Sequence, residues 1–122
     1  MIGGIGVDTI ETARVKKQMA VDAGFKAAIF TADEIAYCDS KHDSAPFYAA
    51  RFAAKEAFLK AIGTGLRDGI SLSDIEIQRD PMGRPSLKLH RRAAEVVSEA
   101  ANIQVSLSHV NEVATAIVVI ER

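Results

Sequence analysis

The sequence predicts a single α+β domain, and three observations favour that class. The chain has 122 residues, a length that suits one domain able to bury its own core. Its 48% hydrophobic and 25% charged residues are typical of a soluble globular protein. Helical patterns dominate the first half of the chain and strand patterns the second half. Helices and strands grouped in this way indicate an α+β domain over residues 1–122.

The N-terminal part is expected to begin with a strand and to continue with helices. Residues 2 to 10 alternate glycine with isoleucine and valine, which predicts a strand ending at Asp8. A polar amphipathic segment follows over residues 11 to 20. The T-x-x-E spacing at residues 31 to 34 is that of a capping box, and it predicts a short helix that runs to about Cys38.

One long helix is expected in the middle of the chain. Ser44 and Pro46 form a fair helix start, and the helical pattern continues to about Ile62. Gly63 and Gly65 follow at once and predict its end.

Charged residues stand in unusual positions on this helix, over residues 51 to 61. At about 100° per residue, its apolar face is formed by Tyr48, Phe52, Leu59 and Ile62. Arg51 and Lys55 fall inside that face, and Glu56 and Lys60 lie along its edge. Like charges at i,i+4 disfavour a helix, so an anion bound between Arg51 and Lys55 is one interpretation. The other is that the long side chains cover apolar surface and extend their charged ends into water.

The second half of the chain is expected to consist of strands around one helix. Isoleucines and leucines alternate on both sides of a turn that contains glycine and two prolines. The expected elements are a strand over 74–80, a return strand after the turn at 81–85, a helix over 90–101, and closing strands over 102–109 and 113–121.

Composition excludes several classes of function. The net charge is −1, which does not suggest duplex DNA as a partner. The single cysteine, Cys38, excludes an intrachain disulfide, and no His/Cys spacing resembles a zinc site. The first residues lack the pattern of a signal peptide, and no apolar run reaches the roughly 20 residues of a membrane span. A cytoplasmic protein is therefore expected.

Two carboxylates from separate elements are the first candidate site. Asp8 follows an apolar strand and Glu56 lies at the margin of the long helix, and such a pair suits Mg²⁺ completed by waters and phosphates. Asp8 has the alternative of capping the strand end. Near the C-terminus, Ser106 and Ser108 are expected to face away from the core, toward solvent, a ligand or another subunit, and His109 ends their strand.

Together these pieces resemble one family. Gly-Ile-Gly-Val-Asp at residues 4 to 8, Arg-Phe-Ala-Ala-Lys-Glu-Ala-Phe-Leu-Lys-Ala at 51 to 61, and Ser-Leu-Ser-His at 106 to 109 occur in that order. The sequence is similar to the holo-[acyl-carrier-protein] synthase family, the small bacterial 4′-phosphopantetheinyl transferases. The resemblance runs from residue 2 to about residue 121.

The resemblance implies a fold with one long central helix packed on a mainly antiparallel sheet. It implies a homotrimer whose active sites lie between subunits. The implied reaction, part of fatty acid biosynthesis, moves 4′-phosphopantetheine from coenzyme A to a serine of apo-acyl carrier protein and releases adenosine 3′,5′-bisphosphate, with Mg²⁺ as cofactor.

The resemblance also implies roles for single residues. Asp8 and Glu56 match the Mg²⁺ ligands, and Lys60 matches a lysine near the attacked phosphate, as an electrostatic stabiliser or a proton donor. The base that deprotonates the serine is either Glu56 or a metal-bound water. Arg51 and Lys55 support the phosphates or the acidic site. Further contacts to coenzyme A are implied for Gly63, Gly65, Gly83, Arg84, Pro85, Ser108 and His109, the last two from another subunit.

The carrier protein is expected to dock on the segment after the first strand. Arg14 matches a docking arginine, and Lys16 and Lys17 lie beside it. Since acyl carrier proteins of this kind are acidic, a basic patch would speed encounter. The alternative is a solvated helix face without a partner. For the whole protein, the alternatives are a module that binds coenzyme A or carrier without turnover, and a phosphatase-like enzyme in which water replaces the serine.

Overall fold

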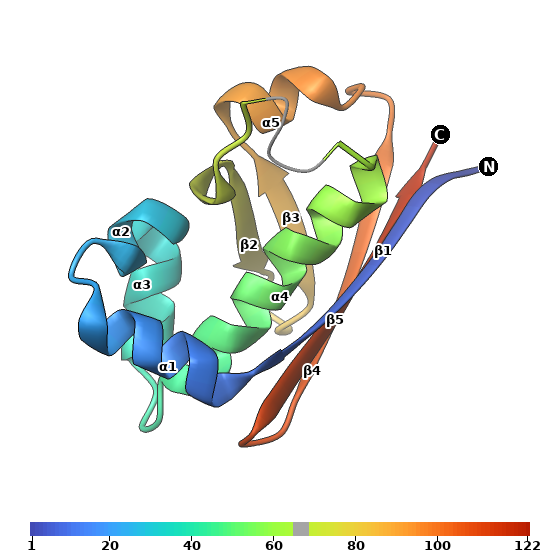
Figure 1. Cartoon of the computed structure of the whole chain (residues 1–122). Helices are drawn as coiled ribbons and strands as arrows, with labels where there is room; N and C mark the ends of the chain where they lie inside the picture. The colour runs from blue at the N-terminus through green and yellow to red at the C-terminus, as the bar shows by residue number, and fades with distance from the viewer. Residues whose placement is uncertain (65–68) are drawn as a thin grey trace.

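A long helix lies across a three-stranded antiparallel sheet in the computed structural model, which describes residues 1–64 and 69–122 (Figure 1). The helices are α1 (Thr12–Val21), α2 (Phe25–Ile29), α3 (Ala32–Asp39), α4 (Ala45–Ile62) and α5 (Arg91–Val96), with a short 3₁₀ turn, η2 (Leu72–Asp74). The strands are β1 (Ile2–Glu11), β2 (Ile75–Arg79), β3 (Pro85–Leu89), β4 (Asn102–His109) and β5 (Val113–Glu121). This arrangement confirms the α+β class and the central helix.

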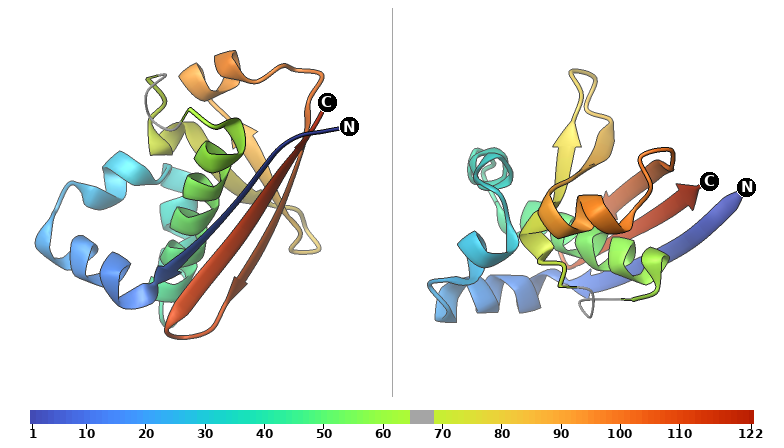
Figure 2. Two further views of the ribbon diagram at one scale, coloured as in Figure 1. Left: turned by 45° about the vertical axis from the view of Figure 1, so that its right-hand side comes forward. Right: turned by 90° about the horizontal axis from the view of Figure 1, so that it is seen from above.

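The strands form two separate sheets. β5 lies in the middle of the larger sheet, between β1 and β4, and both pairings are antiparallel. β2 and β3 form a two-stranded hairpin. The hairpin forms a ladder of its own, but β3 lies beside β4 of the larger sheet, and α4 packs against β2 and the larger sheet (Figures 1 and 2). Helix α4 therefore contacts both sheets.

Two glycines of β1 allow α4 to lie directly on the sheet. A Cβ on Gly6 would be 1.9 Å from the carbonyl oxygen of Ala57, and one on Gly4 would be 2.1 Å from that of Ala61. Only glycine fits where backbone approaches backbone so closely. The neighbouring strand β5 presents small and branched residues to the same helix, namely Ala114, Ala116, Val118 and Ile120, all buried.

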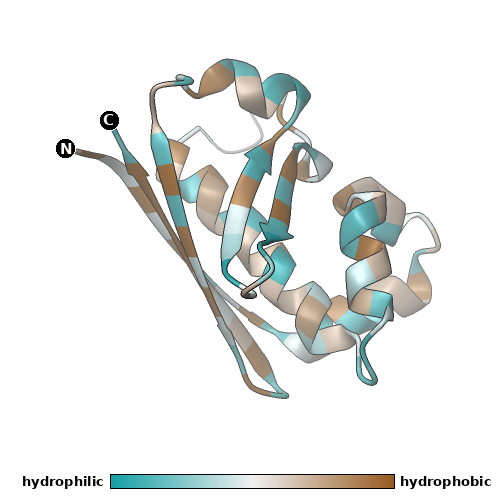
Figure 3. Ribbon diagram, turned by 180° about the vertical axis from the view of Figure 1, so that it is seen from behind, coloured by the Kyte–Doolittle hydropathy of each residue, from teal (hydrophilic) through white to brown (hydrophobic). Residues whose placement is uncertain are grey.

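The opposite face of this sheet is exposed. Ile5 and Val7 of β1 are 60% and 54% exposed, and Ile117 of β5 is 39% exposed. Ser106 and Ser108 of β4 share this face, as expected, because Ser106 pairs with Ile117 in the ladder. Apolar and polar residues alternate along β4 (Figure 3). One face of the sheet therefore carries apolar side chains that this subunit does not bury.

The local signals for helix boundaries were mostly correct. The capping box is present, since Glu34 N donates to Thr31 Oγ1 at 3.2 Å and Thr31 N donates to Glu34 Oε1 at 2.9 Å. Helix α4 ends at Gly63, whose left-handed φ of 80° is typical of a C-cap. Ser44 precedes the helix but makes no side-chain cap bond. Gly65, the second expected stop, lies outside the described residues.

Two expectations about element lengths were wrong, and one helix was missed. The first strand does not end at Asp8 but continues to Glu11, because it pairs along its length with β5. The helix predicted over 90–101 ends at Val96, since the next residue, Val97, is buried in an extended conformation. Helix α2 was not predicted; it has five residues, and Phe25 packs on the rings of Phe30 and Phe52.

Helix length and hydropathy also bear on membranes. Within residues 1–64 and 69–122, no helix is long and apolar enough to cross a bilayer.

Cys38 provides a test of how tightly α3 packs. The residue is fully buried, and burial raises the pKa of its thiol from 9.0 to about 11. Because each pKa unit is tenfold in thiolate, the reactive form at pH 8 is about 100-fold rarer than in an exposed cysteine. We expect Ellman's reagent to react slowly with the native protein and stoichiometrically in guanidinium. Equal rates in both states would show that α3 opens readily.

Candidate active site

The structure brings together Asp8, Glu56 and Lys60, the three residues expected to carry the chemistry. Lys60 Nζ donates to Asp8 Oδ1 at 3.1 Å and to the carbonyl oxygen of Val7 at 3.0 Å. Glu56 lies one helical turn before Lys60 on α4. Burial raises the pKa of Glu56, the Asp8 carboxylate raises it further, and Lys60 opposes both effects. Asp8 is therefore close enough to Glu56 to disfavour the charged form of Glu56.

The close approach of α4 to β1 explains this arrangement. Side chains alternate along a strand, so Gly6, Asp8 and Ile10 share the face that α4 covers. Asp8 thus lies within the strand, on the face that packs against α4, and does not cap the end of the strand. Its side chain is 18% exposed and that of Lys60 is 57% exposed, so the site opens to solvent.

The donor set fits a hard divalent cation. Among the described residues, no cluster of three or more His, Cys, Asp or Glu side chains forms a closed metal cage. Asp8 and Glu56 offer carboxylate oxygens at a solvent-accessible edge, and Mg²⁺ is commonly bound by one or two carboxylates together with waters and substrate phosphates. A cation placed there would also relieve the repulsion that helps to raise the pKa of Glu56.

A groove lined by basic and apolar residues begins beside this site. Ile10 lies two residues beyond Asp8 on the same face of β1, and Phe52 lies one turn before Glu56 on α4. Ile10 is therefore about 7 Å along β1 from Asp8, and Phe52 is about 6 Å along α4 from Glu56. The groove has a volume of about 400 Å³ and is lined by Ile10, Arg14, Val15, Lys17, Gln18, Phe25 and Phe52.

The residues of the predicted basic patch lie on two different faces of α1. Arg14 and Lys17 line the groove beside the carboxylates, whereas Lys16 lines a different depression together with Asp43 and Glu112. Spacings of three residues share a helical face and spacings of two do not. Arg14 and Lys17 are thus the pair that a partner at the carboxylate site would meet.

Arg51 is buried and does not share an anion with Lys55 within the chain. It is 2% exposed, its guanidinium carbon lies 4.3 Å from the ring centre of Tyr37, and Nη1 donates to the carbonyl oxygen of Phe47 at 3.3 Å. Its Nε is buried without a hydrogen-bond partner in the described part of the chain. The residue lines a cavity of about 430 Å³ that Tyr37, Glu76 and Arg79 also line. Arg51 therefore retains unused donor capacity beside a cavity.

Sequence reasoning missed the residues around Arg51. Arg79 and Lys41 also lie over the Tyr37 ring, at 5.5 and 4.6 Å from its centre. They come from β2 and from the loop after α3, so no local spacing relates them to Arg51. Only the contact between α3, α4 and β2 gathers these cations around one aromatic ring.

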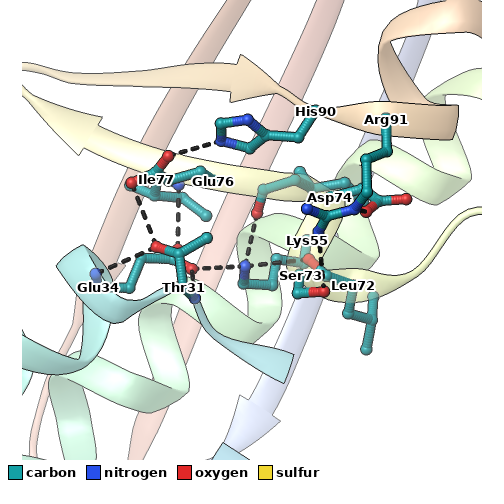
Figure 4. Close-up of polar contacts among 11 residues, drawn as sticks. Thr31, Glu34, Lys55, Leu72, Ser73, Asp74, Glu76, Ile77, His90 and Arg91 are labelled. Atoms are coloured by element: carbon teal, nitrogen blue, oxygen red, sulfur yellow. Dashed lines mark hydrogen bonds and ion pairs between the residues drawn. The ribbon is translucent and has the colours of Figure 1, made fainter. Parts of the chain in front are cut away.

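Lys55 occupies a buried polar cluster instead of a ligand site. Its ammonium is fully buried and donates to Glu34 Oε1 at 2.8 Å, to Leu72 O at 3.0 Å and to Ile75 O at 2.5 Å (Figure 4). A lysine has three donors, and these contacts use all of them. The structure thus contradicts both earlier interpretations: the anion beside Lys55 is Glu34 of the same chain, and the charged end does not extend into water.

The remaining residues expected near coenzyme A fall at two ends of the subunit. Gly83 has φ of 85° at the hairpin turn, and Arg84 Nη2 donates to Gln104 Oε1 of β4 at 3.2 Å. Pro85 opens β3. At the end of β4, Ser108 is exposed, and the ring of His109 meets that of Phe47 edge to face at 5.0 Å. Gly63 lies at the opposite end of α4.

Helix geometry separates His109 from Lys60 within one subunit. Phe47, which contacts His109, precedes Lys60 by 13 residues on α4, a rise of about 20 Å. Ser108 pairs with Thr115, the partner of Thr9, so it lies about 10 Å from Thr9 and on the sheet face opposite Asp8. Neither Ser108 nor His109 of this subunit therefore lies at its own carboxylate site.

Fold and site together define a class of enzyme. A profile described as the 4′-phosphopantetheinyl transferase superfamily matches residues 4–118. The chain belongs to this superfamily.

Its relatives within the class are holo-[acyl-carrier-protein] synthases. The protein of that name from Geobacter sp. (strain M21) is 55% identical over 126 residues, covering 100% of both chains. A solved holo-(acyl-carrier-protein) synthase from Bacillus anthracis str. Ames, in complex with CoA (3′,5′-ADP), is 37% identical with a TM-score of 0.83 over 98% of this chain and 96% of that one. The structure of the synthase from Neisseria meningitidis is 30% identical with a TM-score of 0.86, covering 100% of each. The expected resemblance and the transferase class are confirmed.

Proposed function

We propose that the protein transfers 4′-phosphopantetheine from coenzyme A to a serine hydroxyl of apo-acyl carrier protein in the cytoplasm, releasing adenosine 3′,5′-bisphosphate in a Mg²⁺-dependent reaction. The observation that carries this proposal is the convergence of Asp8, Glu56 and Lys60 at a solvent-open edge between β1 and α4. The Bacillus anthracis relative was solved in complex with CoA (3′,5′-ADP), which supports coenzyme A as the donor substrate.

Each residue of the site has a task in this reaction. Mg²⁺ held by Asp8 and Glu56 would bind the pyrophosphate and offset charge that develops on its bridging oxygen. Lys60, whose ammonium is already held by Asp8 and Val7, places a positive charge and a proton beside the leaving oxygen. Glu56, with its raised pKa, is one candidate to accept the serine proton, and a bound water is the other.

Arg51 is the remaining cation suited to a phosphate of the donor. Its buried Nε and its position on a cavity with Arg79 leave it able to bind an anion. Lys55 is not part of this proposal, because its donors are satisfied within the chain. The contacts by Gly63, Gly65, Gly83, Arg84, Pro85, Ser108 and His109 remain proposals on the family resemblance.

A homotrimer with sites between subunits would explain two features of the isolated subunit. Ile5, Val7 and Ile117 form an exposed apolar strip on the sheet, which a second subunit could bury. Ser108 lies on the sheet face opposite Asp8, and His109 contacts Phe47, which precedes Lys60 by about 20 Å along α4. A neighbouring copy would bring them to the carboxylate site of this one.

Mass spectrometry of the carrier protein tests the proposed reaction directly. Apo-acyl carrier protein is incubated with this protein, coenzyme A and Mg²⁺, and a parallel sample contains EDTA. We expect a mass gain of one phosphopantetheine group that EDTA prevents. No gain with several carriers, despite tight binding of coenzyme A, would favour a binding module. Nucleotide release without a change in carrier mass would favour the phosphatase-like alternative.

Arg14→Ala is expected to weaken the use of the carrier protein selectively. Arg14 lines the groove beside the carboxylate site, where an acidic carrier protein would bind. Its loss should therefore raise KM for the carrier about fivefold and reduce the salt dependence of kcat/KM. KM for coenzyme A should stay within about twofold in the same assay. Arg92→Ala, which removes an exposed arginine of α5, serves as the matched control. A change confined to coenzyme A kinetics would place Arg14 at the nucleotide instead.

A further inference from the structure

Lys55 joins three segments that are distant in the sequence. It projects from α4, and its ammonium contacts a carboxylate of α3, a carbonyl of η2 and a carbonyl of β2 (Figure 4). Burial lowers the pKa of Lys55, and the neighbouring Glu34 carboxylate opposes that shift. The ammonium is held at the base of the hairpin, where β2 begins.

Glu34 binds the same strand through its second carboxylate oxygen. Its Oε2 accepts from the backbone N–H of Ile77 at 3.0 Å, while Oε1 accepts from Lys55 and from Thr31 N. The lysine therefore binds the carbonyl of Ile75 and the glutamate binds the amide of Ile77. Together they satisfy backbone groups of β2 that face away from β3, much as a third strand would.

The hairpin forms its own sheet and is attached to the rest of the subunit at two places. The Arg84–Gln104 hydrogen bond links its turn to β4, and Lys55 and Glu34 hold its base against α3 and α4. β2 pairs with β3, and the three-stranded sheet is built from β1, β5 and β4. A two-stranded hairpin is marginally stable alone, and apolar packing by Ile75 and Ile77 has no preferred direction. Hydrogen bonds from a buried ion pair are directional, so they can define the angle between the hairpin and α4.

Stability alone is a weak reason for this ion pair. Replacing a buried ion pair by apolar residues is often neutral or stabilising, because charges lose their hydration on burial. A geometric role is the better explanation. Lys55 and Glu56 are consecutive on α4, so they point about 100° apart: Glu56 lies by Asp8 of β1, and Lys55 lies by the hairpin.

We propose that the Lys55–Glu34 pair is a positioning element of the transfer site, which holds the β2–β3 hairpin at a fixed angle to α4 and so places the turn at Gly83–Pro85 relative to Asp8 and Glu56. The inference rests on the proposed function, in which that turn borders the nucleotide of coenzyme A. Lys55 and Glu34 act through the hairpin and touch no substrate.

The test compares Lys55→Met, Glu34→Gln and the double variant, with Lys88→Met, an exposed lysine of β3, as the matched control. We expect each single variant to raise KM for coenzyme A about tenfold, with KM for the carrier protein unchanged. The double variant, which leaves no unpaired buried charge, should be less impaired than the product of the single effects. If a single variant fails to fold, the double variant still allows the KM for coenzyme A to be measured without the pair.

Hydrogen exchange measures how well the hairpin is ordered, independently of enzyme activity. Peptides covering residues 75–89 should lose protection in all three variants, while peptides of β1 keep it. Dephospho-coenzyme A, which lacks the 3′-phosphate, separates positioning from direct binding. If Lys55 only positions the hairpin, the KM values for coenzyme A and for the dephospho form should rise by the same factor.

Three results would overturn the inference. The first is a Lys55→Met enzyme that loses its preference for coenzyme A over the dephospho form while Glu34→Gln keeps it, since this would show direct phosphate binding. The second is unchanged KM values, and the third is unchanged hairpin exchange in the folded variants. A wild-type protein without transferase activity would refute the proposed function, and exchange would still decide whether the pair places the hairpin.

Discussion

Glu56→Gln should lower kcat/KM for phosphopantetheine transfer by at least about 10³-fold and leave the fold intact. The amide keeps the size of the side chain but removes one of two carboxylates offered to Mg²⁺ and one candidate for the general base. Activity is measured as release of adenosine 3′,5′-bisphosphate at saturating Mg²⁺, with circular dichroism of each variant. Glu99→Gln, at an exposed position between α5 and β4, is the control. A rate near that of the wild type would refute the metal assignment.

The same variant should be more stable than the wild type at neutral pH. Burial and Asp8 raise the pKa of Glu56 above its ordinary 4.5, so the native state holds this proton more tightly than the unfolded chain does. Stability from this group is therefore complete below pH 4.5 and is lost as pH rises through the folded pKa. Glutamine does not ionise and avoids that loss.

Thermal unfolding in EDTA measures this difference. Tm of Glu56→Gln should exceed that of the wild type at pH 7.5, and the gap should close near pH 4. A variant that is less stable at both values would mean that the carboxylate is favourably bound in the fold, and its inactivity could then not be assigned to chemistry alone.

Gly6→Ala should destabilise the protein by about 3 kcal/mol, the upper part of the usual range for an overpacked core. The new Cβ would stand 1.9 Å from Ala57 O and 2.8 Å from Ala61 N, and backbone atoms cannot turn aside as a side chain can. For a chain of this size the loss corresponds to a fall in Tm of about 10 °C.

Urea unfolding of Gly6→Ala measures the free energy, and Gly24→Ala is its matched control. At Gly24 a Cβ would meet only Asp22 Oδ1, at an ordinary 3.6 Å, so little change is expected there. Similar midpoints for the two variants would show that β1 and α4 can separate without cost.

Activity should fall with stability in Gly6→Ala. Asp8 lies two residues along β1 from Gly6, and separation of β1 from α4 moves Asp8 away from Glu56 and Lys60. Misplacement by about 1 Å can cost about 100-fold in rate. We therefore expect a lower kcat even at temperatures where the variant remains folded.

Where the cause of an element lies in neighbouring residues, the sequence predicted it correctly. The capping box at Thr31 and Glu34 and the left-handed Gly63 after α4 are of this kind. The strand that continues through Asp8 depends instead on pairing with β5, and the early end of α5 depends on burial of Val97. No short window of sequence contains those partners.

The features of the site also separate into those that neighbouring residues determine and those that depend on distant partners. The spacing of Glu56 and Lys60 on one helix and the order of the motifs along the chain are local features of the sequence. Together with the family resemblance, they predict the transferase class from the sequence alone. The sequence also showed that Arg51 and Lys55 were out of place on an apolar face. It could not supply Glu34 as the anion for Lys55, or Tyr37 as the ring beneath Arg51, because those contacts join residues of α3 to residues of α4. A charge on a helix acquires its role from the groups that folding brings to it, and only the packing of α3, α4 and β2 brings them here.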